Sequence, residues 1–201
     1  MKPVKAFGLA MIATVATIAF VGAGSASAAA TLLCNQHVAL GACTEPTQHV
    51  HLVATNPEIL TSFGNIKCES VLLLAEVLGL GEPQVLHGNR TYLKCELGGS
   101  ACTEVTETSA GVLINILRTG EELGEATSRG RVKIICSGLE CEFEESSEHI
   151  GHWLGPSLTG DGGHITYTKA KDVKVGGGIL CPSSTLLDAL FVSLTRVYLN
   201  S

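Results

Sequence analysis

The stretch 131–146, RVKIICSGLECEFEES, alternates apolar and polar residues on both sides of a Ser-Gly pair. A period of two is typical of strands that bury one face, and a Ser-Gly pair favours a turn. We therefore predict an antiparallel hairpin whose four-residue loop covers 137–140. Cys136 then lies opposite Cys141 at a Cα separation of about 4.5–5.5 Å, which a disulfide can span, and we predict that these two cysteines are bonded. The same register places Ile134 opposite Phe143 and Lys133 opposite Glu144.

Short runs rich in β-branched residues continue along the chain between Gly-rich separators. These runs cover 49–54, 91–96, 102–108, 112–118, 131–136, 140–146, 164–168 and 172–175. Many short strands between regular turns indicate a single all-β domain, either an antiparallel sandwich or a barrel. Two Leu-rich segments, 70–80 and 186–199, fit a short helix as well as a buried strand. We favour a strand for 186–199, where β-branched and aromatic residues are frequent, and leave both options open for 70–80.

The chain has eight cysteines, all of which follow residue 28. An even number in an exported chain indicates a disulfide framework, whose connectivity composition alone does not fix. Proximity along the chain favours three local pairs and leaves one long-range pair. These pairs are Cys34/Cys43, Cys95/Cys102, Cys136/Cys141 and Cys68/Cys181. None has the C-x2-C spacing of a zinc ribbon or a thioredoxin-like redox site.

The first 28 residues have the three parts of a secretory signal peptide. Lys2 and Lys5 precede an apolar stretch of small residues, which ends in the A-x-A site at 26–28. Cleavage there leaves 29–201 as one extracellular domain with no membrane anchor, and the net charge shifts from 13 − 19 = −6 to 11 − 19 = −8. An acidic chain without a basic cluster does not favour nucleic acid as a partner.

Histidine is the residue most able to supply a metal site. His49 and His51 share one strand face, and His149, His152 and His164 could supply a third ligand. Three histidines with one open position are a common way to hold catalytic zinc. The alternative is that these residues are solvated surface histidines, and we expect no metal or other cofactor.

Other candidate sites are weaker. The acidic residues Glu140, Glu142, Glu144, Glu145 and Glu148 could form a calcium or paired-carboxylate site, but alternation explains them more simply as the wet face of the hairpin. No G-x-S-x-G motif is present, and pairing leaves no free cysteine, so we expect no catalytic residue. An exposed Trp153 beside His149 and His152 would form a binding patch, since aromatic faces are common platforms for ligands.

Several short stretches resemble a group of exported, β-rich, cysteine-containing proteins of soil actinobacteria. These stretches are Cys34-x8-Cys43, Lys67-Cys68-Glu69-Ser70, Gly81-Glu82-Pro83, Thr91-Tyr92-Leu93-Lys94-Cys95, Ala101-Cys102-Thr103, Val132-Lys133-Ile134-Ile135-Cys136-x4-Cys141-Glu142-Phe143 and Cys181-Pro182. The resemblance implies an extracellular β-sandwich-like domain and carries no catalytic residues. The chain departs from it at 70–80 and 186–199, which are Leu-rich where the group is Thr-rich.

The sequence therefore predicts a secreted structural or binding module at the cell envelope or in the medium. A small extracellular hydrolase, made metal-dependent by the histidines, is the alternative. Convergence of three histidine rings in one concave site would distinguish the two.

Overall fold

The computed structural model describes residues 32–37, 46–78 and 81–200, which form strands and one short helix. The strands are β1 (Leu32–Cys34), β2 (His49–Thr55), β3 (Glu58–Thr61), β4 (Gly64–Leu78), β5 (Gln84–Leu97), β6 (Ser100–Ala101), β7 (Glu104–Glu107), β8 (Val112–Gly120), β9 (Leu123–Arg129), β10 (Arg131–Cys136), β11 (Leu139–Glu145), β12 (Ile150–Leu154), β13 (His164–Gly177), β14 (Ser184–Ser193) and β15 (Tyr198–Asn200). The helix is α1 (Pro156–Thr159). The all-β prediction is confirmed.

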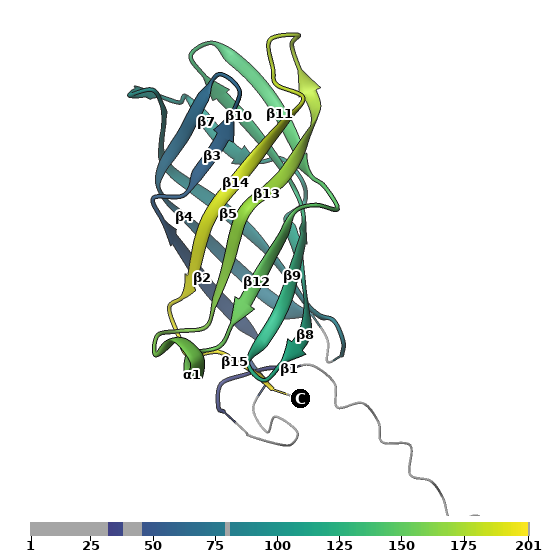
Figure 1. The fold of residues 1–201 in the computed structure, drawn as a ribbon. Helices are drawn as coiled ribbons and strands as arrows, with labels where there is room; N and C mark the ends of the chain where they lie inside the picture. Colours follow the sequence, from purple (N-terminus) through teal and green to yellow (C-terminus); the bar gives the residue numbers. More distant parts are fainter. Residues whose placement is uncertain (1–31, 38–45, 79–80, 201) are drawn as a thin grey trace, which may run out of the picture.

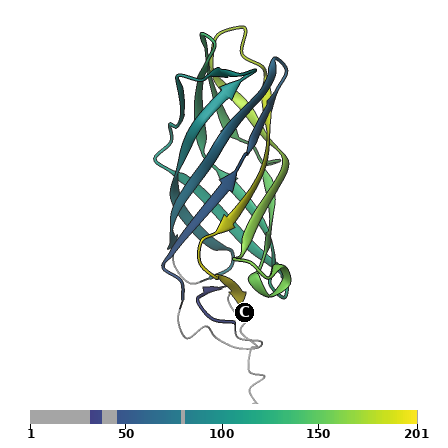
Figure 2. The same cartoon turned by 90° about the vertical axis from the view of Figure 1, so that its left-hand side faces the viewer.

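The strands close into an antiparallel barrel with eight strands at every level (Figures 1 and 2). Four long strands, β4, β5, β13 and β14, run the full length. Near α1 the gaps between them are filled by β2, β8, β9 and β12, and we call this eight-stranded level the α1-end ring. Beyond it the gaps are filled by β3, β7, β10 and β11, and we call that eight-stranded level the hairpin-end ring. Of the two architectures that the sequence left open, the barrel is the one formed.

The Leu-rich segments are strands because both of their edges are paired. Strand β4 hydrogen-bonds to β2 on one side and to β5 on the other, and its side chains alternate between the interior and the outer wall. Val71, Leu73 and Ala75 are buried, while Leu74 is 56 % exposed. Strand β14 alternates in the same way, so the alternative of short helices in 70–80 and 186–199 is wrong for the described parts of both segments.

The α1 end of the barrel is closed by a two-stranded ribbon of β1 and β15 (Figure 1). Leu33 and Leu199 from this ribbon are buried against the barrel interior. The one helix within 32–37, 46–78 and 81–200 has four residues, which is too short to span a bilayer. The opposite end carries the long β13–β14 hairpin, which projects beyond the neighbouring strands.

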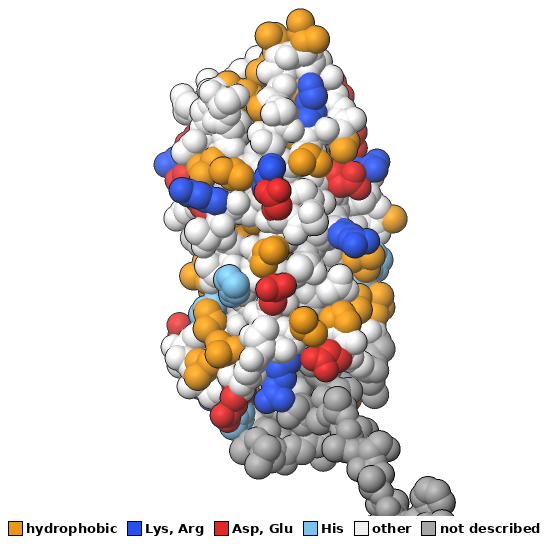
Figure 3. Space-filling view, turned by 45° about the vertical axis from the view of Figure 1, so that its right-hand side comes forward, with side chains coloured by type: hydrophobic (Ala, Val, Ile, Leu, Met, Phe, Trp, Pro, Cys, Tyr) orange, Lys and Arg blue, Asp and Glu red, His pale blue; other side chains and the backbone are white. Residues whose placement is uncertain are grey.

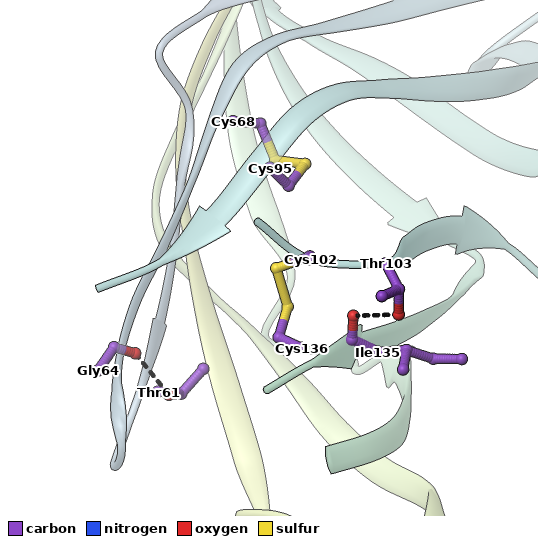
Figure 4. Close-up of a disulfide and its surroundings, with 8 residues drawn as sticks. All are labelled: Thr61, Gly64, Cys68, Cys95, Cys102, Thr103, Ile135 and Cys136. Atoms are coloured by element: carbon purple, nitrogen blue, oxygen red, sulfur yellow. Dashed lines mark hydrogen bonds between the residues drawn. A yellow bond between two sulfur atoms is a disulfide. The ribbon is translucent and has the colours of Figure 1, made fainter. Parts of the chain in front are cut away.

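Disulfides form the predicted framework with a different connectivity. The bonds are Cys68–Cys95, Cys102–Cys136 and Cys141–Cys181. The first two lie close together in the hairpin-end ring (Figure 4), where the Thr103 hydroxyl also donates to Ile135 O at 3.2 Å. Cys34 is disulfide-bonded as well, and its expected partner Cys43 lies outside the described residues.

The predicted pairs Cys95/Cys102, Cys136/Cys141 and Cys68/Cys181 are wrong. The turn between β10 and β11 explains why Cys136 and Cys141 are not bonded to each other. The turn has two residues, Ser137 and Gly138, with φ of 51° and 78°, and not four. Both angles are positive, as in the type I′ turns that suit hairpins. Cys136 therefore lies opposite Leu139, and Cys141 lies opposite Ile134. A register shift of two residues does not change which face a side chain is on, but it separates the two cysteines.

Candidate functional sites

A layer of buried charges crosses the barrel interior where the two rings meet. Arg90 points inward from β5 and donates from Nε to Oε2 of Glu107 at 2.8 Å, and its Nη1 contacts Glu145 Oε1. The three side chains are at most 7 % exposed. Gly130, between β9 and β10, leaves the room they need, because a Cβ there would lie 2.8 Å from Arg90 Nη2.

His149 extends this layer from the bend between β11 and β12. Its Nδ1 lies 2.6 Å from Asp172 Oδ1 and its Nε2 lies 3.7 Å from Glu145 Oε1. Nδ1 is within hydrogen-bond distance of its carboxylate, whereas Nε2 is buried without a hydrogen bond among the described residues. The layer therefore combines the Arg90 guanidinium and the His149 imidazole with the carboxyl groups of Glu107, Glu145 and Asp172.

Burial governs the acid–base behaviour around the charged layer. It raises the pKa of Tyr92 and of Tyr167 well above the ordinary tyrosine value, so both phenols stay neutral. For Arg90, burial opposes the charged form, but the facing carboxylates of Glu145 and Glu107 outweigh it and raise the pKa of the guanidinium. The layer is charged, paired and shielded from solvent, which suits it to holding strands in register.

The five candidate metal ligands lie in three separate places. His49 and His51 face outward from β2 and, with Glu76 and His87, line a groove of about 420 Å³ on the outer wall. His152 and His164 lie on the β12–β13 wall, and His149 lies in the barrel interior. In the described ranges, no three His, Cys, Asp or Glu side chains are placed to hold a metal ion.

The predicted patch of His149, His152 and Trp153 does not share one surface. Strand alternation turns His152 outward and Trp153 inward, and the indole is fully buried. His149 is buried in the charged layer. No exposed aromatic platform is therefore formed at this position.

The acidic residues of β11 are divided between the outer wall and the barrel interior. Glu140 and Glu144 are on the outer wall, where they pair with Lys133 at 2.8 Å and Arg131 at 3.4 Å. Glu142 also faces outward, but Glu145 is buried in the charged layer, which corrects its assignment to the wet face. Glu145 shares the parity of the inward-facing Cys141 and Phe143, a signal that was present in the sequence.

A buried carboxyl group lies at the α1 end. Glu122 occupies the β8–β9 turn at φ 56°, and its side chain is 1 % exposed. Burial raises the pKa of Glu122, and His37, whose Nε2 lies 3.5 Å from Oε1, opposes this rise. Gly155 lies directly against the carboxyl group, where any larger residue would clash with it.

The tip of the β13–β14 hairpin is a feature that sequence reasoning treated only as a turn. Ile179 is 97 % exposed and Leu180 is 71 % exposed, the highest values among the large apolar residues described. The available signal was two adjacent apolar residues between the glycines 176–178 and Pro182, at a position where turns are usually polar.

No protein-family model matches the chain, and no curated protein or solved structure matches it either. The three disulfides indicate that the protein folds in an oxidising, extracellular-type environment.

Proposed function

We propose that the protein is a secreted structural or binding module that acts through its outer surface, at the cell envelope or in the medium. The disulfides support an extracellular setting, since such bonds persist where the environment is oxidising. The resemblance to exported β-rich proteins of soil actinobacteria points the same way.

The observation that carries the proposal is that side chains fill the barrel along its length. In the α1-end ring the interior holds large residues that are at most 1 % exposed: Leu52, Leu73, Leu86, Ile116, Trp153 and Ile165. The charged layer follows, and Ile66, Val132, Ile134 and Phe143 are buried in the hairpin-end ring. Barrels of about eight strands are just wide enough for side chains to fill them. A partner is therefore expected to bind on the outside.

The metal-dependent hydrolase has less support. Its chemistry would need at least three protein ligands around one ion with a position left for water. The candidate histidines lie in three places, and His149 is enclosed in the charged layer. We therefore keep a binding role as the proposal.

A fractionation assay tests the proposed function. Residues 29–201, purified with the disulfides intact and fluorescently labelled, are incubated with peptidoglycan, wall polysaccharide, membrane and soluble fractions of the producing organism. We expect saturable retention by at least one fraction, which excess unlabelled protein competes away. The matched control is the same protein after reduction and alkylation in denaturant. Absence of saturable retention by every fraction would contradict the proposal.

A further inference from the structure

The β13–β14 hairpin presents two neighbouring aliphatic side chains to solvent at the end of the barrel. Ile179 and Leu180 are 97 % and 71 % exposed. Figure 3 shows apolar side chains at this extremity of the molecule. Exposed apolar residues are ordinary when they are single, whereas adjacent ones on a projecting element are typical of interaction sites.

The hairpin tip is held in one conformation. The backbone N–H of Cys181 donates to Gly178 O at 3.1 Å, which closes a turn with Ile179 and Leu180 at its centre. The Cys141–Cys181 disulfide joins this turn to β11. Gly177, at φ 99°, allows the close approach, because a Cβ there would lie 2.7 Å from Cys181 Sγ. A contact surface that is already ordered loses less conformational entropy when it binds.

A polar depression of about 300 Å³ lies directly beside the tip, on the outer wall of β10, β11 and β13. It is lined by Thr108, Lys133, Glu140, Cys141, Glu142, Gly177 and Gly178. Lys133 is paired with Glu140 at 2.8 Å. Glu142 accepts a hydrogen bond from the Thr108 hydroxyl at 2.7 Å, and no described Lys, Arg or His lies within salt-bridge distance of it. The depression therefore offers a carboxylate to a basic group.

We propose that the tip and this depression form one contact surface for an extracellular protein that has an apolar pocket with a basic side chain on its rim. The pocket would receive Ile179 and Leu180, and the basic group would pair with Glu142. This inference rests on the proposed role as a binding module and names the surface that performs it.

The charges of the surface favour a separate protein over the other occupants. The chain carries a net charge of −6, and Glu140 and Glu142 beside the tip oppose contact with anionic lipid. A second copy would bring the same carboxylates face to face.

Photocrosslinking at the tip tests the inference. The probe is residues 29–201 with benzoylphenylalanine at position 180, incubated with intact cells and medium of the producing organism. The matched control carries the same group at position 194, because Leu194 is 67 % exposed and follows β14 at its other end. We expect one protein adduct from position 180 and none from position 194. Wild-type protein should compete for the adduct, and I179D/L180D and E142K should each compete at least about tenfold less well.

Each other outcome overturns the inference. These outcomes are no adduct from position 180, equal adducts from both positions, an adduct with lipid or with a second copy, or equal competition by the variants. Thermal unfolding of I179D/L180D should match that of wild type, since both side chains are exposed. If labelled wild type is retained by a fraction but position 180 gives no adduct, the tip is wrong and the binding role stands. If nothing retains the wild type, both fail.

Discussion

Replacing Arg90 with methionine would leave two buried carboxylates without their cation. Glu107 and Glu145 are 6 % and 3 % exposed, and Arg90 contacts both. Removing one partner of a buried ion pair costs about 3–5 kcal/mol, because the remaining charge is neither solvated nor paired. For a chain of this size that cost lowers the midpoint of thermal unfolding by roughly 6–20 °C.

The assay for R90M is urea unfolding at pH 7 with the disulfides intact, followed by tryptophan fluorescence. Arg131 supplies a matched control, because its pair with Glu144 lies on the outer wall and the Arg131 side chain is 48 % exposed. R131M should cost less than about 1 kcal/mol, as exposed ion pairs do. E145Q should recover part of the loss when it is combined with R90M. Equal costs for R90M and R131M would refute the idea that the charged layer stabilises the barrel.

Three further predictions concern other parts of the barrel. Burial raises the folded-state pKa of Glu122, so folding favours its protonated form, and native stability should fall as pH rises from about 4.3 through the raised value. E122Q should therefore unfold at a higher temperature than wild type at pH 8 and show no such gain at pH 3. A gain of equal size at both pH values would contradict this role of the Glu122 carboxyl group. C141S/C181S removes a disulfide with a sequence separation of 40, and the chain-entropy model predicts that it lowers the free energy of unfolding in urea by about 4 kcal/mol. A loss near zero would contradict that prediction. Trp153, the single tryptophan, is 0 % exposed, so iodide should quench its fluorescence only after unfolding, and strong quenching in the native state would be inconsistent with its position.

Alternation along the chain predicted many of the strands and most of their faces, although β3, β9 and β12 lie outside the predicted runs. In the hairpin of β10 and β11 it placed Val132, Phe143 and both cysteines inside. It did not determine the turn, because a two-residue and a four-residue loop give the same faces and differ only in which residues are opposed. The disulfide pairs depended on that difference. Ser137, a non-glycine residue at positive φ, gives little sequence signal for the tighter turn.

The candidate sites were harder to predict because they depend on contacts between distant strands. Arg90, Glu145 and Asp172 are separated by dozens of residues, and only barrel closure brings them together. The parity of Glu145 predicts that it points inward but does not identify its partner. The tip residues Ile179 and Leu180 were visible as apolar residues within a turn, yet their exposure follows from how far the hairpin projects.

The four long strands have a consequence for how the molecule responds to damage. The three described disulfides all join parts of the hairpin-end ring. Strands β4, β5 and β13 nevertheless belong to both rings, because each continues from the hairpin-end ring into the α1-end ring. A ring that shares its strands with its neighbour cannot melt alone without fraying that neighbour. We expect C141S/C181S, which removes a bond at one end of the barrel only, to increase amide hydrogen exchange at the other end too.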